Sequence, residues 1–366
     1  MYGKSVKINH WLIPISWLYG LGVEIRNKLF DWGILPAEEF DIPVISVGNL
    51  AVGGTGKTPH IEYLIELLGH KYHIAVLSRG YKRKSRGFIL ADDKSTAREI
   101  GDEPYQIKRK YPNITVAVDA NRRRGIKQLK KQIPDIDVIL LDDAFQHRYV
   151  KPGLTILLID YNRPIHLDRM LPAGRLREPE SGKKRADIII VSKCPAQLSE
   201  AEQRALRSEI APLPSQQLYF TTLAYGKLQP LFTAEPEKRL EEIRKNEHIL
   251  LVTGIASPAA IIDKLSAYTQ FITPLTFPDH HDFDATDMKR ITEAFKKLPA
   301  GRRFIVTTEK DAARLITHPL LDETLKPSIY VLPVEVAFLN EEEHLFNQNI
   351  IEYVRKNSRN SSFSKS

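Results

Sequence analysis

Residues 44–58 read Val44-Ile-Ser-Val-Gly-Asn-Leu-Ala-Val-Gly-Gly-Thr-Gly-Lys-Thr58, and this stretch decides the fold. Its start is typical of a β-strand, the glycines predict a tight loop, and residues 61–68 continue with helix-compatible apolar spacing. Glycines let backbone N–H groups turn around phosphate oxygens, and the N-terminus of the following helix adds its positive end. The stretch therefore predicts a phosphate-binding loop, called the P-loop below.

The residues of this loop can be given separate tasks. Lys57 is expected to reach the β- and γ-phosphates of a nucleotide, and the hydroxyl of Thr58 is expected to ligate Mg²⁺. The standard pattern has glycine five positions before Gly56, where this chain has Ala51. A glycine-rich turn without function is the alternative, and the order of strand, loop, Gly-Lys-Thr and helix counts against it. The predicted nucleotide-binding residues are Gly53, Gly54, Thr55, Gly56, Lys57 and Thr58.

A second polar motif follows another predicted strand. The apolar run Val138–Leu141 leads directly into Asp142 and Asp143, and the carboxyl ends of strands are where α/β sheets bind ligands. One carboxylate can hold Mg²⁺ together with Thr58 while the other orients a neighbour. Gln146 and His147 come next and are expected to point into the same site. The alternative is that the aspartates cap a helix.

The rest of the chain alternates short apolar runs with helical stretches. Such runs are typical of parallel strands covered on both faces, and intervening helices indicate βαβ units. The prediction is an α/β, P-loop NTPase-like, doubly wound and mainly parallel sheet with a second, smaller α/β domain. The first set of expected strands is Val44–Val47, Ile74–Leu77, Thr115–Val118, Val138–Leu141, Thr155–Ile159 and Ile188–Ser192, with Leu218–Thr222 as a strand or a connector. The second set is Ile249–Thr253, Phe271–Leu275, Phe304–Thr307 and Ile329–Leu332, with helices at Pro258–Tyr268, Thr286–Lys297 and Glu341–Lys356.

Four segments are expected along the chain. Residues 1–35 are predicted to be a membrane-associating amphipathic segment, and residues 36–225 the P-loop domain. Residues 226–356 are predicted to form the smaller C-terminal domain, because proline and glycine punctuate the region from 226 to 236. The Ser-rich tail, residues 357–366, is expected to be disordered.

Composition limits the possible partners. The chain has 366 residues and a formal net charge of +8, which favours an anionic partner such as a phosphate ligand, a nucleic acid or a membrane surface. The single cysteine, Cys194, excludes an internal disulfide framework and a Cys-rich zinc module. No run of 18 apolar residues is present, which disfavours a conventional spanning helix.

The start of the chain favours a membrane surface among these partners. All three tryptophans, Trp11, Trp17 and Trp32, lie there, and apolar residues recur at helical spacing from residue 18 to 32 beside Arg26 and Lys28. Tryptophans with basic neighbours on an amphipathic helix are typical of the bilayer interface. Pro14, Gly20 and Gly22 interrupt the stretch, which argues further against a span. The alternative is a helix docked on the protein's own core.

The motifs together resemble the tetraacyldisaccharide 4'-kinase family, the lipid A 4'-kinases of Gram-negative bacteria. The resemblance spans roughly residues 10–315, and Ala144 stands where the family usually has glycine. It implies transfer of the ATP γ-phosphate to the 4'-hydroxyl of an acylated glucosamine disaccharide 1-phosphate, with ATP and Mg²⁺, by a peripheral protein of the cytoplasmic face of the inner membrane. The matching segments are Gly48–Leu50, Val52–Pro59, Leu77–Tyr81, Gly101–Pro104, Leu141–Arg148, Leu171–Pro179, Phe277–His280 and Thr307–Asp311.

The resemblance also assigns roles to residues. It points to Asp102 as the base near the sugar hydroxyl, and to His280 as its support in the second domain; alone, Asp102 reads as a turn or helix cap, and His280 as part of a polar loop or a metal cluster. The planar guanidinium of arginine is suited to bind phosphates through two hydrogen bonds. Arg177, in the same motif as Arg175, is a candidate for this role as well. The residues expected to bind substrate are Arg79, Asn121, Arg122, Gln146, His147 and Arg175.

Two other functions compete with the kinase. A membrane-associated, GTPase-like nucleotide switch shares the P-loop and the strand-end aspartates. However, Thr308-Glu-Lys-Asp311 has Glu309 in place of the asparagine of the guanine-reading motif and lies in the second domain. Nucleic-acid binding would explain the positive charge but not the Trp-rich start. Neither a specific nucleic acid nor an obligate protein partner is expected.

Overall fold

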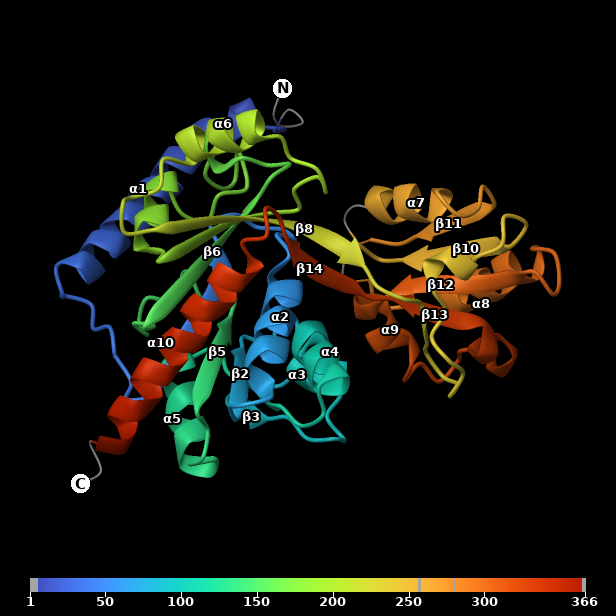
Figure 1. Cartoon of the computed structure of the whole chain (residues 1–366), viewed down its shortest axis with the longest axis horizontal. Coiled ribbons are helices and arrows are strands. Elements are labelled where there is room, and N and C mark those ends of the chain that lie inside the picture. Colours follow the sequence, from blue (N-terminus) through green and yellow to red (C-terminus); the bar gives the residue numbers. More distant parts are fainter. Residues whose placement is uncertain (1–5, 256–257, 279–280, 364–366) are drawn as a thin grey trace. The chain divides into compact units, whose positions relative to one another are not determined.

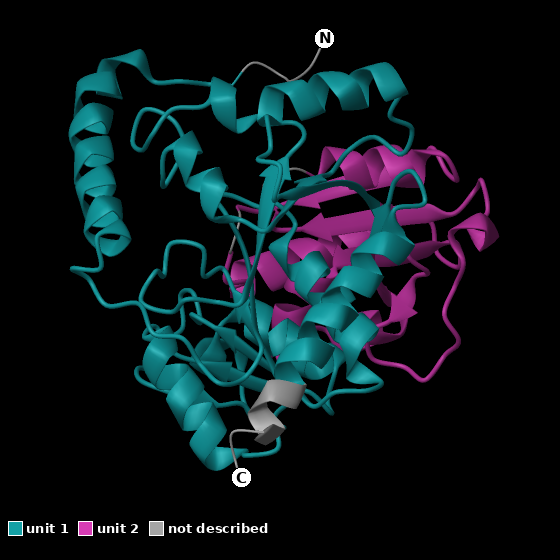
Figure 2. Ribbon diagram, turned by 60° about the vertical axis from the view of Figure 1, so that its left-hand side comes forward, with its two compact units in different colours: residues 1–223, 336–366 teal, residues 224–335 magenta. Residues whose placement is uncertain are grey.

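The computed structural model describes residues 6–255, 258–278 and 281–363, the last five of these by their backbone alone. The chain divides into two compact units, shown in different colours in Figure 2: unit 1 is Met1–Leu223 with Val336–Ser366, and unit 2 is Ala224–Glu335. The first division lies two residues from the predicted boundary. The second differs from the prediction, because residues 336–356 belong to unit 1 rather than to the C-terminal domain.

Unit 1 is built on a nine-stranded sheet with the order β14-β8-β7-β6-β1-β5-β2-β4-β3 (Figure 1). The pairs β1–β5, β1–β6, β2–β4, β2–β5, β6–β7 and β7–β8 are parallel, and β3–β4 is antiparallel. The strands are β1 (Val44–Asn49), β2 (Ile74–Ser78), β3 (Ile89–Leu90), β4 (Thr115–Val118), β5 (Val138–Asp142), β6 (Leu154–Asp160), β7 (Ile188–Ser192), β8 (Gln217–Tyr225) and β14 (Val334–Phe338).

Helices cover both faces of this sheet, as a doubly wound fold requires. Leu77 of β2 packs in one cluster with Ile126 and Leu129 of α5. Ile74 of the same strand points to the opposite face, where its side chain lies 3.8 Å from the position that a Cβ on Gly69 of α2 would take. The helices are α1 (Ile13–Asp31), α2 (Lys57–Gly69), α3 (Ala97–Ile100), α4 (Asp102–Lys110), α5 (Arg122–Gln132), α6 (Glu200–Ile210) and α10 (Glu343–Phe363). Short 3₁₀ turns lie at His10–Leu12, Ile165–Leu167 and Glu180–Arg185.

Long-range packing explains why the C-terminal segment belongs to unit 1. Tyr63 of α2 donates a hydrogen bond of 2.7 Å to Asn347 of α10, and Phe346 of α10 packs edge-on against Tyr219 of β8. The helix runs through Phe363, so the backbone of residues 357–363 is helical where the sequence predicted disorder.

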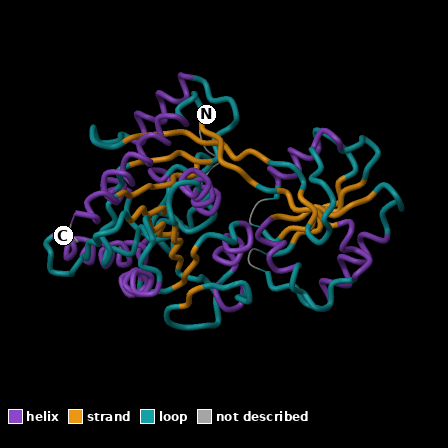
Figure 3. Tube along the Cα trace, turned by 60° about the horizontal axis from the view of Figure 1, so that its bottom comes forward, coloured by secondary structure: helices purple, strands orange, loops and turns teal. Residues whose placement is uncertain are grey.

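Unit 2 has a five-stranded sheet in the order β11-β10-β12-β13-β9, parallel except for β9. The strands of both sheets are drawn in orange in Figure 3. Helix α8 packs on it through Met288, Ile291 and Phe295. The α/β class predicted for both parts of the chain is confirmed. The strands are β9 (Gln229–Pro230), β10 (His248–Thr253), β11 (Ile272–Thr276), β12 (Arg303–Thr308) and β13 (Ile329–Leu332); the helices are α7 (Ala259–Ser266), α8 (Ala285–Lys296) and α9 (Glu309–Leu315), with 3₁₀ turns at Leu240–Glu242 and Glu323–Ser328.

The N-terminal helix α1 is continuous. It runs through Gly20 and Gly22 without a break, and Pro14 lies in its first turn, where a missing N–H costs no hydrogen bond. The interruption expected at these residues is therefore wrong. Among the described helices, none is long and apolar enough to cross a bilayer.

Candidate active site

The P-loop joins β1 to α2 at the carboxyl edge of the sheet. Gly53 and Gly56 have left-handed backbone angles, φ 120° and 83°, which residues with a Cβ rarely adopt. The amide of Asn49 at the end of β1 donates a hydrogen bond of 2.8 Å to the Thr55 hydroxyl and closes the base of the loop. Lys57 and Thr58 begin α2, so the six predicted nucleotide-binding residues form one continuous loop and helix start.

A second segment pairs with the outer edge of the loop. The N–H of Val52 donates to the carbonyl of Arg175 at 2.8 Å, and the N–H of Arg177 donates to that of Leu50 at 2.7 Å. Ala51, which replaces the standard glycine, thereby forms an isolated β-bridge with Leu176. The guanidinium of Arg175 lies 3.7 Å from the position that a Cβ on Gly53 would take, so this predicted residue lies against the loop.

The two aspartates after β5 have opposite electrostatic environments. Asp142 is buried, and the Ser78 hydroxyl donates to its Oδ2 at 3.0 Å. Burial raises the pKa of Asp142 to about 7, and the nearby carboxylates of Glu103 and Asp143 add to the rise. Because this value is close to neutrality, Asp142 exchanges between its charged and neutral forms near physiological pH.

Asp143 is held by cations. Burial alone would raise its pKa, but the ammonium of Lys57 at 3.7 Å and the guanidinium of Arg177 at 2.8 and 3.1 Å outweigh burial and lower it to about 2. Arg177 also donates to the side chain and backbone carbonyl of Asn49. The pair of aspartates therefore consists of one permanently ionised carboxylate and one that titrates near neutrality, and Arg177 ties the first to the P-loop.

The residues at this edge fit a Mg²⁺ ion. Oδ1 of Asp142 is buried and accepts no hydrogen bond from the described residues, which is costly for a carboxylate unless another ligand satisfies it. Carboxylate and hydroxyl oxygens are ligands suited to Mg²⁺. The sequence predicts Thr58, Asp142 and Asp143 as metal ligands without choosing between the two aspartates. Because Asp143 is engaged by Lys57 and Arg177, Asp142 and Thr58 are the residues that would hold the ion, and this assignment stays a prediction.

The start of α4 lies close to the aspartates. Gly101 and Gly80 approach so closely that a Cβ on Gly101 would lie 3.1 Å from the Gly80 Cα. This contact holds Asp102 and Glu103 beside the end of β2, and Asp102 is half-buried as the first residue of α4. Glu103 lies in the Gly101–Pro104 segment that the sequence analysis singled out, and its charge helps to raise the pKa of Asp142, although the sequence analysis assigned it no role of its own. Its neighbour Asp102 was favoured there only through the family resemblance.

The side chain of Arg122 is hydrogen-bonded to the backbone next to the aspartates. It is buried and donates to the carbonyls of Asp119 at 3.2 Å and Asp142 at 3.1 Å. Burial lowers the pKa of Arg122 to about 10, so it remains charged at neutral pH. Asn121 is the N-cap of α5 and accepts from the N–H of Arg124 at 3.1 Å. These contacts are within the protein, so both residues shape the site, and their contact with substrate stays a prediction.

The predicted residues after the aspartates also contact the loop. Gln146 donates to the Asn49 carbonyl at 2.8 Å. Nε2 of His147 accepts the N–H of Arg122 at 3.2 Å. Burial, together with the charges of Arg122, Arg26 and Arg79, lowers the pKa of His147 to about 4. His147 is therefore neutral and lies in a strongly positive environment suited to an anion.

The other predicted catalytic residue, His280, lies outside the described residues. Unit 1 holds Asp102, and the residues on both sides of position 280 belong to unit 2. The pairing of Asp102 with His280 stays a prediction.

The Thr308–Asp311 motif of unit 2 has a structural role. The Thr308 hydroxyl accepts the Asp311 N–H at 3.2 Å and caps α9, while Asp311 accepts the N–H of Gly254 at 2.9 Å. Burial raises the pKa of Asp311. The contacts tie β12 and α9 to the end of β10.

Helix α1 is attached to the same region by polar contacts. The Tyr19 hydroxyl donates to the Arg177 carbonyl at 3.1 Å, and Arg26 donates to the Gln146 carbonyl at 2.9 Å. Only Ser16 and Phe30 of the helix are buried. The apolar residues that it leaves exposed include Ile15, Trp17, Leu18, Leu21 and Ile25, with Trp11 and Trp32 at its two ends. Helix α1 is thus docked on unit 1 through polar side chains such as Tyr19 and Arg26, as the alternative expected, but most of its apolar side chains do not pack on the core.

The glycine-rich loop, Lys57 and the two aspartates together define a P-loop nucleotide-binding protein. These residues are arranged to bind phosphates and a divalent cation. A family model described as "Tetraacyldisaccharide-1-P 4'-kinase" matches residues 8–354, and the chain belongs to this family. The resemblance inferred from the motifs is confirmed. The chain is accordingly a kinase, and the GTPase-like alternative is less supported.

Relatives match over nearly the whole length. A tetraacyldisaccharide 4'-kinase of Phocaeicola vulgatus is 61% identical over 366 residues, covering 100% of both chains. Another, from Bacteroides thetaiotaomicron, is 56% identical and covers 98% of this chain and 97% of the relative. A crystal structure described as an "apo" form of LpxK from Aquifex aeolicus in complex with ATP has a TM-score of 0.71 at 29% identity, covering 94% of this chain and 98% of that one.

Proposed function

We propose that this protein transfers the γ-phosphate of ATP to the 4'-hydroxyl of a tetraacyldisaccharide 1-phosphate, forming lipid IV-A. The observation that carries the proposal is the match to the family model over residues 8–354, and the P-loop with the aspartates beside it supports the proposal. The similar LpxK structure of Aquifex aeolicus is described in complex with ATP, which supports ATP as the donor.

Charge and position divide the work among the residues of unit 1. The P-loop amides and Lys57 bind the nucleotide phosphates, and Lys57 neutralises charge that builds up on the transferring group. Asp143 keeps the ammonium of Lys57 at the mouth of the loop, 3.7 Å away. Asp142 and Thr58 are the residues that would hold a Mg²⁺ ion, and the bound ion would supply positive charge that offsets the charge of the phosphates.

The acceptor hydroxyl needs a proton acceptor. We assign this task to Asp102, which begins α4 beside the buried acidic group, with His280 as its support. The positive environment of His147, formed by Arg26, Arg79 and Arg122, suits an anionic group of the substrate.

We further propose that the protein acts at the cytoplasmic surface of the inner membrane as a peripheral protein. Trp17 and Leu18 of α1 are 73% and 72% exposed, far more than apolar side chains that pack on a core. Tryptophans and basic residues on a helix with an apolar face suit the boundary between headgroups and acyl chains. An acylated substrate lies in a bilayer, so a surface-bound enzyme would meet it there.

One experiment tests the reaction directly. The purified full-length chain is incubated in detergent with ATP, Mg²⁺ and tetraacyldisaccharide 1-phosphate, and the lipid is analysed by mass spectrometry. We expect a product with one added phosphate, and none with the Lys57→Ala variant as a matched control. Hydrolysis of GTP without phosphorylation of the lipid would instead support the nucleotide switch.

A further inference from the structure

Three consecutive carbonyl groups of the P-loop are bonded by side chains that lie outside the loop, two at the end of β7 and one in α2. The Lys193 ammonium donates to the carbonyl of Gly54, and the Ser192 hydroxyl donates to the carbonyl of Thr55 at 2.8 Å. Nδ1 of His60 lies 2.7 Å from the carbonyl of Gly56. None of these three donors belongs to the predicted site.

The direction of these carbonyls matters for phosphate binding. In a planar trans peptide, the C=O of one residue and the N–H of the next point in opposite directions. Holding the carbonyls of Thr55 and Gly56 on the outside therefore turns the N–H groups of Gly56 and Lys57 to the inside. Inward N–H groups at a helix start are the donors that bind phosphate.

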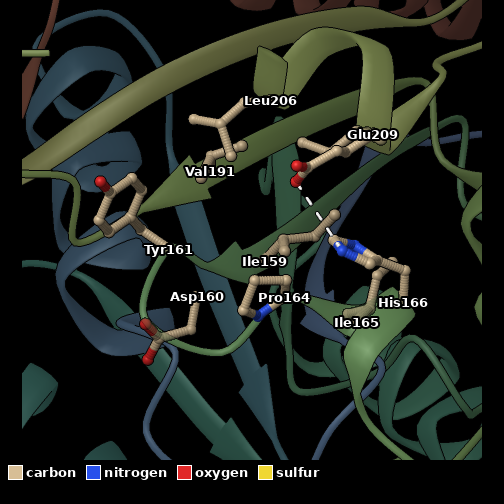
Figure 4. A pocket seen from close by; sticks show the side chains of 10 residues that line it. Ile159, Asp160, Tyr161, Pro164, Ile165, His166, Val191, Leu206 and Glu209 are labelled. Carbon is tan, nitrogen blue, oxygen red and sulfur yellow. Dashed lines mark ion pairs between the residues drawn. The ribbon is translucent and has the colours of Figure 1, made fainter. Parts of the chain in front are cut away.

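Lys193 is itself fixed in place. It follows β7 directly and has a left-handed backbone angle, φ 58°. The carboxylate of Asp160, at the end of the neighbouring strand β6, accepts from its ammonium at 2.9 Å. Figure 4 shows Asp160 next to Tyr161, at one side of a small pocket that is lined by apolar residues and by the paired side chains of His166 and Glu209.

His60 can be assigned one tautomer. A carbonyl oxygen can only accept, so Nδ1 carries the proton, and Nε2 accepts from the Thr221 hydroxyl at 3.2 Å. The side chain is buried, and burial lowers the pKa of His60 to about 4. The neutral ring therefore links the last glycine of the loop to β8 across the whole physiological pH range.

We propose that Lys193, Ser192 and His60 are positioning residues that set the affinity of the P-loop for the phosphates of ATP and ADP. They act through the loop carbonyls and do not touch the nucleotide. The inference rests on the proposed function only in requiring that this loop binds nucleotide. Its test uses binding without lipid, so its failure and the failure of the kinase reaction are distinguishable.

The first test replaces Lys193 by methionine, which keeps the stem and removes the ammonium. Because a hydrogen bond from a charged group is lost, we expect ADP and ATP to bind about 10-fold more weakly by isothermal titration calorimetry. Lys193→Arg should restore most of the affinity. Lys151→Met is the matched control, since Lys151 pairs with Glu39 away from the P-loop, and it should bind nucleotide as the unchanged protein does.

A merely structural role would give a different result. It would lower the melting temperature of the nucleotide-free protein and leave the Kd of the folded fraction unchanged, and this outcome overturns the proposal. In steady-state assays, the KM for ATP should rise more than kcat falls. If Lys193→Met does not fold, Ser192→Ala, which removes one hydroxyl, decides in its place: an unchanged Kd for ADP overturns the proposal.

Asp160 supplies an independent check. Among the described residues, the side chain of Asp160 is linked to the loop through the ammonium of Lys193, so Asp160→Asn should weaken ADP binding less than Lys193→Met does. The double variant should bind no more weakly than Lys193→Met alone, because residues in one chain of contacts are not additive. Multiplicative losses would show that Asp160 acts elsewhere and would refute this arrangement.

Discussion

Proton and metal should compete for Asp142, and the competition can be measured. Its pKa is raised to about 7 by burial and by Glu103 and Asp143, so its ionised fraction increases from about one-tenth at pH 6 to about nine-tenths at pH 8. Metal binding requires the ionised form. The apparent affinity for Mg²⁺ should therefore increase about 10-fold over this range and level off above pH 8.

The neighbouring aspartate provides the control. Asp143, with its pKa lowered to about 2, is ionised throughout this pH range and adds no pH dependence of its own. The assay is the Mg²⁺ concentration for half-maximal ADP binding, measured from pH 6 to pH 8.5 in the unchanged protein, Asp142→Asn and Asp143→Asn. Titration of the nucleotide itself is common to all three proteins and cancels in the comparison.

The expected outcome is specific to one variant. Asp142→Asn should lose the extra pH dependence, and Asp143→Asn should keep it. If the three proteins show the same pH dependence, Asp142 does not titrate near neutrality or does not hold the ion, and the reasoning is refuted.

The metal-free protein should respond to pH in the opposite sense. The folded pKa of Asp142 lies above its ordinary value of 3.8, so the stability that the neutral carboxyl contributes is complete below about pH 4. It is lost as the pH rises through 7. From pH 6 to pH 8 the free energy of unfolding should fall by roughly 1 kcal/mol more in the unchanged protein than in Asp142→Asn.

Three further changes test other parts of the site. Lys57→Ala should lower kcat by about 10²-fold or more without changing the melting temperature, because the ammonium neutralises charge in the transition state; near-normal turnover would remove its role. Asp102→Ala should slow turnover by roughly 10²–10⁴-fold with ADP affinity unchanged, and adding His280→Ala should cost little more if the two act as a unit; fully multiplicative losses would show independent roles. Replacing Trp17 and Leu18 by serine should abolish cosedimentation with anionic vesicles at unchanged melting temperature, whereas unaltered cosedimentation would contradict membrane binding by α1.

Local patterns predicted much of the fold. Thr115–Val118, Ile188–Ser192 and Ile329–Leu332 match observed strands residue for residue, because buried parallel strands are continuous apolar runs bounded by polar turns. The position of α10 was not predictable in this way. An apolar helical stripe shows that a helix packs, but its partner is set by contacts as distant in sequence as Tyr63 and Asn347.

The site was predictable where strand ends carry polar residues, and less so where long-range pairing decides. The bridge between Ala51 and Leu176 places Arg177, rather than Arg175, on Asp143, and no local feature separates the two arginines. Lys193 could have been found, since it follows a predicted strand at the same sheet edge as the aspartates. The burial of His60 could also have been predicted, because it lies four residues before Leu64 and therefore on the same buried face of α2.

The attachment of α1 has a practical consequence for producing the protein in quantity. Many peripheral enzymes can be made easier to handle by cutting off a terminal anchor, but here Tyr19 and Arg26 are bonded to the backbone of Arg177 and Gln146, whose side chains both reach Asn49 at the P-loop. Removing α1 would therefore delete these two hydrogen bonds next to the nucleotide site together with the exposed apolar surface of the helix. To prepare the protein without detergent, it is therefore better to replace exposed apolar residues of α1, such as Trp17 and Leu18, by polar ones and to keep Tyr19 and Arg26.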